Sequence, residues 1–487
     1  MSTTSPSKAP SEAAKPLARG ETWRGLVERL SERMSKRKAA SRRLLAQLVP
    51  AAERLLSESG DTEGQRLAGE LAEGLGGLDD AELREFFIVL ANRFGPDEAG
   101  LKAAARAYLK EPSAQTAAAL NLAAEPRRQE LLRRLNMAPG GTALIVKLRE
   151  RVLEMAQPDF VPVAADMRHL LASWFNRGFL KAEKLDWNSP AVVLENIIRF
   201  EAVHEISDWD SLRSRLQGNR RCFGFFHPAM PGVPLIFIEV ALTREMSPAI
   251  APLLASAELE APLKAPTNAV FYSINNCHAG LKGISLGDLL IKQVVLDLRT
   301  EFPSLKDFAT LSPIPGFRKW LTRAERSPGL VPPAVSEALA TEEWWRKPGL
   351  AEQVRQPLLV LCAEYLTGRT PEGGKGRVSD PVARFHLTNG ARLERINWLA
   401  DTSPKGIAES CGLMVNYRYL LNAIEANHHA FVSTDHVITS AAVKKMRDSG
   451  LPGSQRLARS TFLPTLKRAA GLARADGGGR QNSQGKR

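Results

Sequence analysis

Residues 271–298 read FYSINNCHAGLKGISLGDLLIKQVVLDL, and this stretch decides the fold. Its β-branched and aromatic start predicts a strand, which passes into a glycine-rich turn at 280–287 and then into a helix. The apolar stripe of that helix is Leu286, Leu289, Leu290, Val294 and Leu298. A strand, a glycine turn and an amphipathic helix in succession indicate a layered domain that contains both strands and helices.

The glycine turn also offers a place for a phosphate. Glycines let a ligand approach the backbone closely, and the free N–H groups at a helix N-terminus attract anions. The turn contains neither a P-loop nor a G-x-G-x-x-G fingerprint. Two interpretations therefore stay open: a turn made tight for packing, or a site for a diphosphate such as that of coenzyme A or a nucleotide.

Three strand-like runs appear in this part of the chain, and the last of them is the strand that opens this stretch. They are Cys222 to Phe226, Pro234 to Leu242 and Ala269 to Ile274. Helical patterns alternate with these runs, and a second helical stretch at about 321–378 interrupts the order. We therefore expect an α+β fold whose mixed α/β domain covers residues 187–469.

The region before this domain has a helical pattern almost throughout. In one segment Leu83, Phe86, Phe87, Leu90 and Phe94 fall on one helix face. Asp79 and Glu82 ahead of it have the spacing of a capping box. We expect an all-helical domain at 21–186 that supports assembly and supplies no catalytic group. Residues 1–20 and the basic tail 470–487 have little to bury and are expected to be disordered.

The chain is strongly basic. Its 487 residues carry a formal net charge of +13, with a pI near 9.7. Three interpretations would explain this excess of positive charge: a solvated helix face with a basic tail, a nucleic-acid partner, or a phosphate-rich cofactor. No recognisable nucleic-acid-binding motif is found, and aromatic residues make up only 6% of the chain. We therefore expect no nucleic acid among the partners.

The cysteines and the N-terminus indicate where the protein works. Four cysteines lie far apart and form no C-x-x-C pair, namely Cys222, Cys277, Cys362 and Cys411. Such cysteines are typical of a reducing compartment. The N-terminal residues lack the apolar stretch of a secretory signal, and no apolar run is long enough to cross a bilayer. We expect a cytoplasmic protein that does not enter a membrane.

Three polar side chains stand where they could carry chemistry. Ser312 follows a short predicted strand in DFATLSPIPGFRKW (307–320), where it could cap the next turn or present a catalytic hydroxyl. No G-x-S-x-G elbow is near, so a hydrolase nucleophile is poorly supported. His386 has a Phe-His-Leu context, which fits a histidine of the core as well as a catalyst. Tyr419, in a downstream tyrosine pair, could belong to the core or line a pocket.

Four long segments, taken in order, resemble the malonyl-CoA decarboxylase family. They read FFHPAMPGVPLIFIEVALT (225–243), VFYSINNCHAGLKGISLGDLLIKQVV (270–295), FATLSPIPGFRKWL (308–321) and FHLTNGARLERINWLADTSPKGIAESCGLMVNYRYL (385–420). They cover most of 222–420, whereas the N-terminal half matches mainly in its helical character. The resemblance implies a helical domain followed by a catalytic domain related to the GNAT acyltransferases.

The resemblance also implies a set of site residues. The coenzyme A thioester would lie against Gly280, Lys282, Gly283, Ile284, Ser285, Leu286, Gly287 and Asp288, and would contact Ser312 and His386. Ser312 and His386 would be the catalytic pair, and Tyr419 would line the active site. Animal members carry an acidic residue where this chain has Ser285, so a carboxylate role at that position is not expected here. A homotetramer is implied as well, and the end of the chain does not match the peroxisomal tripeptide of the animal members.

The activity implied is the decarboxylation of malonyl-CoA to acetyl-CoA and CO2. The thioester carbonyl can accept the electrons that CO2 leaves behind, so we expect no metal and no bound cofactor. The only histidine-rich group, His428, His429, Asp435 and His436, has no spacing typical of zinc or iron. Ser312 would hydrogen-bond the carboxylate or, as the resemblance implies, accept a proton, and His386 would act as a general acid that titrates near neutral pH. The alternative in the same fold is an acyltransferase that moves an acyl group from coenzyme A to an amine.

Overall fold

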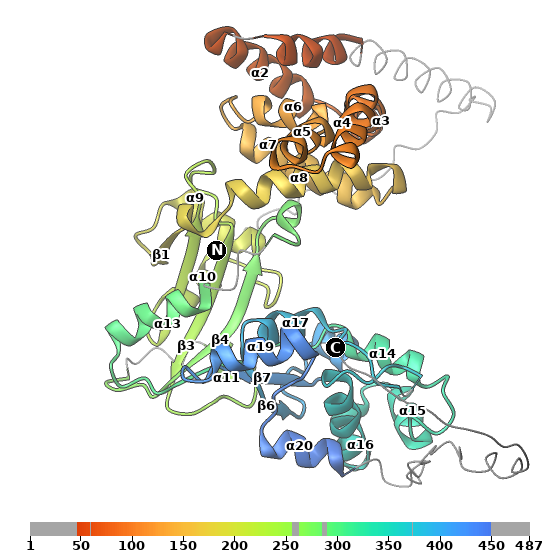
Figure 1. The fold of residues 1–487 in the computed structure, drawn as a ribbon. Helices are drawn as coiled ribbons and strands as arrows, with labels where there is room; N and C mark the ends of the chain where they lie inside the picture. Colours follow the sequence, from red (N-terminus) through yellow and green to blue (C-terminus); the bar gives the residue numbers. More distant parts are fainter. Residues whose placement is uncertain (1–45, 59, 256–262, 285–289, 373, 450–487) are drawn as a thin grey trace, which may run out of the picture.

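The computed structural model describes residues 46–449 apart from 59, 256–262, 285–289 and 373, and it contains two regions of different architecture (Figure 1). The described part of the first region is built from helices, and the second region surrounds a seven-stranded sheet. This confirms the predicted order of a helical region followed by a mixed α/β domain. The ends predicted to be disordered, 1–20 and 470–487, lie outside the described residues.

The helical region packs its helices around an apolar core. Its elements are a helix at 46–57, α2 (Asp61–Gly76), α3 (Asp80–Arg93), α4 (Glu98–Lys110), α5 (Ala114–Ala124), α6 (Arg127–Leu135), α7 (Gly141–Met155), η1 (Pro158–Phe160), α8 (Val161–Trp174) and η2 (Arg177–Phe179). The predicted capping box is confirmed, because the Asp79 side chain accepts from the N–H of Glu82, whose own carboxylate accepts from the N–H of Asp79. Within the structure described, no helix is both long enough and apolar enough to span a membrane.

The sheet has the strand order β1-β2-β3-β4-β5-β7-β6. The strands are β1 (Lys181–Leu185), β2 (Arg220–Phe226), β3 (Ile236–Thr243), β4 (Asn268–Asn276), β5 (Asp307–Thr310), β6 (Arg392–Asn397) and β7 (Met414–Arg418). β2, β3 and β4 lie where the sequence predicted strands. β1 was not predicted, so the sheet begins before residue 187. Its sequence, KAEKL, is that of a charged strand at the edge of a sheet, which has little hydrophobic pattern to detect.

Helices cover both faces of the sheet. α13 (Leu290–Glu301) shares a core with Ile236 and Ile238 of β3, and its buried residues continue the predicted apolar stripe. Residues of α9 (Ala191–Phe200) and α10 (Trp209–Leu216) form a second core with Phe237, whose side chain points to the opposite face. The other helices are α11 (Ala251–Leu254), η3 (Ala279–Leu281), α14 (Phe317–Ala324), α15 (Pro333–Leu339), η4 (Trp344–Arg346), α16 (Pro348–Leu366), α17 (Pro381–Thr388), α18 (Pro404–Ser410), α19 (Ile424–Thr434) and α20 (Ala441–Asp448).

β4 and β5 are the one parallel pair in the described sheet, and they separate along their length. Their pairing ends with Phe271 opposite Thr310. β4 continues to Asn276, whereas the chain after β5 turns toward β7, where Ser312 pairs with Val415. The sheet therefore opens between the second half of β4 and the segment that carries Ser312.

Candidate active site

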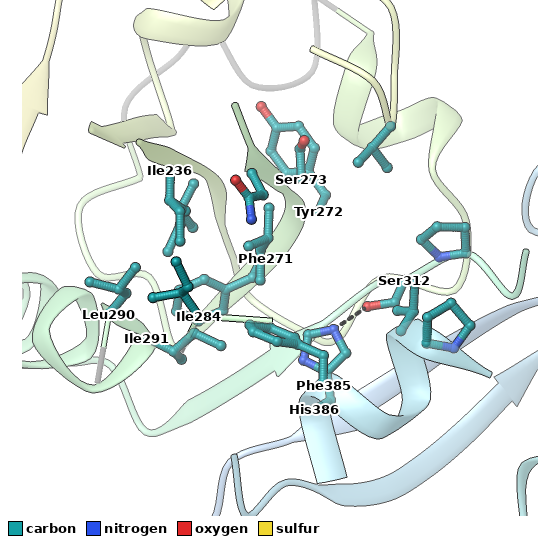
Figure 2. Close-up of a pocket in the computed structure, with 17 residues that line it drawn as sticks. Ile236, Phe271, Tyr272, Ser273, Ile284, Leu290, Ile291, Ser312, Phe385 and His386 are labelled. Atoms are coloured by element: carbon teal, nitrogen blue, oxygen red, sulfur yellow. Dashed lines mark hydrogen bonds between the residues drawn. The ribbon is translucent and has the colours of Figure 1, made fainter. Parts of the chain in front are cut away.

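A cavity of about 350 Å³ lies where β4 and β5 separate. Its apolar lining includes Val203, Ile236, Ile238, Phe271, Ile274, Ile284, Leu290 and Ile291, and its polar lining includes Tyr272, Ser273, Asn276, Ser312 and His386. Figure 2 shows Ser312 and His386 on one side of this space and Ile284 on another. Among the residues that the structure describes, no Asp, Glu, Lys or Arg lines the cavity. The site is thus an apolar space with a neutral polar group at one side.

Ser312 and His386 form that polar group, and two further hydroxyl groups extend it. His386 Nε2 lies 3.1 Å from Ser312 Oγ, and His386 Nδ1 lies 2.9 Å from the hydroxyl oxygen of Tyr419. The Ser312 hydroxyl donates to Thr310 Oγ1 at 2.8 Å. When Nε2 carries the proton and Tyr419 donates to Nδ1, each of these contacts is a hydrogen bond. The four side chains then form one continuous chain.

Strand geometry and a helix cap bring these groups together. Thr310 and Ser312 are two residues apart in extended chain, so their side chains point to the same side. His386 lies in α17, and Asp380 caps this helix by accepting from two N–H groups of its first turn. The buried Asp380 carboxylate also accepts from the N–H of Gly316, in the turn after Ser312, at 3.2 Å. One carboxylate therefore fixes the helix of His386 to the turn of Ser312.

Burial keeps the reacting side of the cavity neutral. His386 is 3% exposed, and burial lowers its pKa to about 3. The ring of Tyr417 stacks on the imidazole with centroids 4.7 Å apart, and burial raises the pKa of Tyr419 above its usual value. Neutral imidazole and neutral phenol are therefore the forms present at pH 7. This contradicts the expectation that His386 titrates near neutral pH, which took no account of burial.

The glycine turn follows β4 at another side of the cavity. Gly280 is buried, and a Cβ atom there would lie 2.0 Å from the carbonyl oxygen of Val146 in α7. Packing against the helical region therefore requires glycine at this position. Lys282 and Gly283 are exposed, and Ile284 reaches into the cavity. Ser285, Leu286, Gly287 and Asp288 lie outside the described residues.

Comparison with known proteins identifies the family. A family model described as "Malonyl-CoA decarboxylase C-terminal domain" matches residues 178–458, which is more than half of the chain. The chain belongs to the malonyl-CoA decarboxylase family. A second model, "Malonyl-CoA decarboxylase N-terminal domain", matches residues 94–175, so the family covers the helical region as well.

Relatives and solved structures agree with this assignment. The mitochondrial malonyl-CoA decarboxylase of Anser anser anser is 35% identical over 426 residues, which is 79% of this chain and 84% of that protein. The mitochondrial enzyme of Rattus norvegicus is 35% identical over 436 residues, 81% of this chain and 87% of that protein. A crystal structure of malonyl-CoA decarboxylase from Rhodopseudomonas palustris is 48% identical, with a TM-score of 0.77, over 82% of this chain and 99% of that one.

The structure brings the three predicted catalytic residues of this family member into one hydrogen-bonded group. Tyr419, however, lies behind His386 and is not among the residues that line the cavity. It contacts the imidazole rather than the space open to a ligand. Ser312 does not use its hydroxyl to cap the following turn, because that hydroxyl contacts Thr310 and His386. The catalytic roles themselves stay predictions.

Two members of the site were missed by the sequence analysis. Thr310 could have been found from strand alternation, since it shares a side with Ser312. Asp380 precedes Pro381, which is the local signal of a helix cap. Its second contact, with the N–H of Gly316, has no local signal because it joins two distant segments.

The histidine-rich group near the C-terminal end of the described chain contributes to packing. His428 Nδ1 contacts the carbonyl oxygen of Thr388, which joins α19 to α17. Asp435 pairs with Arg377 at 3.1 Å. These contacts hold parts of the described chain together and give no sign that the group binds a ligand.

Proposed function

We propose that the chain removes CO2 from malonyl-CoA and releases acetyl-CoA. The observation that carries this proposal is the neutral Ser312–His386 pair in a cavity whose described lining has no charged side chain. Family membership supports the choice of substrate, because the named relatives are malonyl-CoA decarboxylases.

The substrate itself supplies the electron sink. When the bond between the α-carbon and the carboxylate breaks, its electron pair moves onto the thioester carbonyl and forms an enolate. We therefore propose that the reaction requires neither a metal nor a bound cofactor. Backbone N–H groups around the opening between β4 and β5 are the candidates for stabilising the enolate oxygen.

A neutral site favours the loss of a carboxylate. A cation beside the carboxylate would stabilise the substrate more than the transition state, in which negative charge has moved toward the thioester oxygen. The Ser312 hydroxyl and the Nε2–H of His386 can orient the carboxylate through hydrogen bonds without a full opposing charge. The apolar walls exclude water from the ionised group, which raises the free energy of the bound substrate relative to the transition state.

Protonation of the enolate carbon completes the reaction. His386 is the proposed donor through Nε2, and it acts as a neutral imidazole because burial lowers its pKa. The imidazolate that remains regains its proton from solvent before the next turnover. An enolate carbon is a strong base, and neutral imidazole serves as the electrophile in some isomerases. The Tyr419 hydroxyl donates to Nδ1 and so keeps the proton on Nε2, which makes Tyr419 a positioning residue.

The glycine turn is the proposed site of the coenzyme A moiety. Lys282 and Gly283 are exposed at the turn, and Ile284 reaches from it into the cavity. A thioester that extended from this turn to Ser312 would pass along the apolar walls. The remaining residues of the predicted site, 285–288, are part of this proposal although they lie outside the described residues.

The test is to incubate the purified full chain with malonyl-CoA alone and to follow the thioesters by liquid chromatography. We expect acetyl-CoA and CO2 in equal amounts with no acceptor present. In D2O, one deuterium should enter the methyl group of acetyl-CoA, because the enolate takes its proton from exchangeable groups. Consumption of malonyl-CoA only after an amine is added would support the acyltransferase instead.

We also propose that the protein is a cytoplasmic homo-oligomer, with the division at 21–186 and 187–469 moved slightly so that β1 belongs to the catalytic domain. The described cysteines are free and buried, which agrees with a reducing compartment. The mitochondrial location in the names of the animal relatives is a property of those proteins. Light scattering on the purified chain and fractionation of its native cells would test both points.

A further inference from the structure

The backbone of the glycine turn is held by two arginines of the helical region. Arg149 of α7 donates from Nη1 to the carbonyl oxygen of Gly280 and from Nη2 to that of Lys282, the second at 2.9 Å. Arg168 of α8 donates from Nε to the carbonyl oxygen of Gly283 at 3.0 Å. Figure 1 shows α7 and α8 at the end of the helical region that faces the sheet. Two helices more than a hundred residues upstream therefore fix the turn.

Arg149 and Arg168 differ from two buried arginines elsewhere in the described chain, each of which pairs with a carboxylate. Arg128 pairs with Asp166, and Arg215 pairs with Glu239 at 2.8 Å. Arg149 is equally buried, yet neither it nor Arg168 forms an ion pair with any carboxylate of the residues described. Burial, and to a smaller extent the nearby positive charge of Arg168, lowers the pKa of Arg149. Two uncompensated positive charges thus lie beside the turn.

Both arginines have N–H groups for which the described residues provide no acceptor. The Nε–H of Arg149 is buried without an acceptor in the structure as described. Arg168 is exposed, and the contact with Gly283 uses only its Nε, so both Nη groups are directed to no described acceptor. A guanidinium with two free Nη groups has the fork geometry that suits a phosphate.

The arginine contacts also set the direction of the turn's N–H groups. Across a trans peptide bond the C=O of one residue and the N–H of the next point in opposite directions. Because Arg149 binds the carbonyl oxygen of Lys282, the N–H of Gly283 points away from Arg149. Gly283 has φ +77°, a conformation that glycine adopts readily, and its N–H has no acceptor among the residues described. Because Gly283 is exposed and its N–H has no described acceptor, this N–H is available to donate to a ligand.

We infer that Arg149 and Arg168 recognise the phosphate end of the coenzyme A thioester, an inference that rests on the proposed function. Arg168 binds a phosphate directly through its free Nη groups. Arg149 is a positioning residue, which holds the turn so that the Gly283 N–H faces the same phosphate and adds positive charge from behind. The helical region therefore contributes to substrate recognition, and not to assembly alone.

The inference is tested by combining arginine variants with shortened substrates. The variants are Arg168→Gln, which removes the exposed charge, and Arg149→Lys, which keeps the charge but cannot bind two carbonyls as a fork. The matched control is Arg151→Gln on α7, because Arg151 pairs with Asp80 instead of contacting the turn. The substrates are malonyl-CoA, its 3′-dephospho form, and malonyl-pantetheine, which has no phosphate.

We expect Arg168→Gln to lower kcat/KM for malonyl-CoA roughly ten- to a hundredfold, the usual effect of losing a charged hydrogen bond, with kcat nearly unchanged. Arg149→Lys should act in the same direction, whereas Arg151→Gln should have no effect. Neither Arg168→Gln nor Arg149→Lys should change kcat/KM for malonyl-pantetheine, which has no phosphate to bind. A loss with the 3′-dephospho substrate equal to that with malonyl-CoA assigns Arg168 to the diphosphate, and a loss confined to malonyl-CoA assigns it to the 3′-phosphate.

Equal losses with malonyl-CoA and malonyl-pantetheine would overturn the inference, because the arginines would then only hold two regions together. Unchanged kinetics in Arg168→Gln would overturn it as well. Calorimetric titration with coenzyme A, which requires no turnover, checks the same point and should show weaker binding by Arg168→Gln. If the wild-type chain decarboxylates none of the three thioesters but binds coenzyme A through Arg168, the proposed function fails while the phosphate site stands.

Discussion

The two ends of the cavity are built in opposite ways. At the reacting end, Ser312 and His386 are buried, neutral and bonded within the sheet domain. At the turn, Arg149 and Arg168 reach across from the helical region and bring positive charge without carboxylate partners in the described structure. In the proposed function, the bond that breaks releases neutral CO2 from an anion, whereas the phosphates of coenzyme A stay bound at the turn throughout the reaction. Charged side chains are therefore absent from the described lining at the reacting end, and the two arginines bring positive charge to the proposed phosphate site.

The largest effect in this comparison of the two ends is expected from His386→Asn, at the reacting end. Asparagine keeps a donor N–H of similar size but does not release a proton readily. Turnover should fall by roughly 10²–10⁴-fold, the scale of general acid–base catalysis, while KM changes little. Steady-state kinetics on a variant with a wild-type circular dichroism spectrum measures this. Turnover equal to that of the wild type would remove His386 from the reaction.

Ser312→Ala should have the next largest effect. The substrate carboxylate loses a hydrogen-bonding partner, and the Nε2–H of His386 loses its acceptor, so we expect kcat to fall by roughly ten- to a hundredfold. Ser410→Ala is the matched control, because Ser410 is equally buried but bonds only to backbone carbonyls of its own turn. Mass spectrometry of wild-type enzyme quenched during turnover should find no acyl group on Ser312. An acylated serine would replace the proposed mechanism with covalent catalysis.

At the turn, Gly283→Asp should weaken the binding of coenzyme A by roughly tenfold. The substitution puts a carboxylate where phosphate is proposed to bind, and it adds a Cβ to a residue at φ +77°. Gly329→Asp is a close control, since Gly329 is exposed and has φ +75° in a loop outside the cavity lining. Calorimetry should separate the two variants. Equal affinities in both folded proteins would place the phosphates elsewhere.

The smallest expected effect concerns pH. Burial lowers the pKa of His386 to about 3, so the imidazole is already neutral above that value and does not change state on the way to pH 8. The profile of kcat/KM, which reports the free enzyme, should therefore show no His386 titration between about pH 5 and 8. An acidic limb near pH 6.5 that disappears in His386→Asn would show that the histidine titrates as it does in water.

The sequence predicted the centre of the fold better than its margins. β4, the glycine turn and α13 were found because a strand pattern, glycines and a helical stripe follow one another within 271–298. β1 was missed because a charged edge strand has little hydrophobic alternation. The pairing of Ser312 with His386 rested on the family resemblance, since their separation in sequence gives no local pattern.

The protonation and the contacts of the site residues were harder to predict from the sequence than the identity of those residues. The pKa of His386 depends on the burial of its side chain, which lies against the ring of Tyr417. The residues next to His386 in the sequence do not reveal this burial. Gly280 was considered as a phosphate contact, but its lack of a side chain is required by Val146. The contacts of Arg149 were not predicted either, because a helical pattern shows which face is buried and not which distant backbone lies against it.

The contact between Gly280 and α7 has a thermodynamic consequence. Because the turn packs on the backbone of α7 and is bonded by Arg149, it keeps its shape only while the helical region is folded. Any ligand that binds the ordered turn must then stabilise the helical region, since a ligand that binds only the native state raises its apparent stability by mass action. If coenzyme A binds at the turn as proposed, the thermal unfolding of the helical region therefore reports whether that site is occupied.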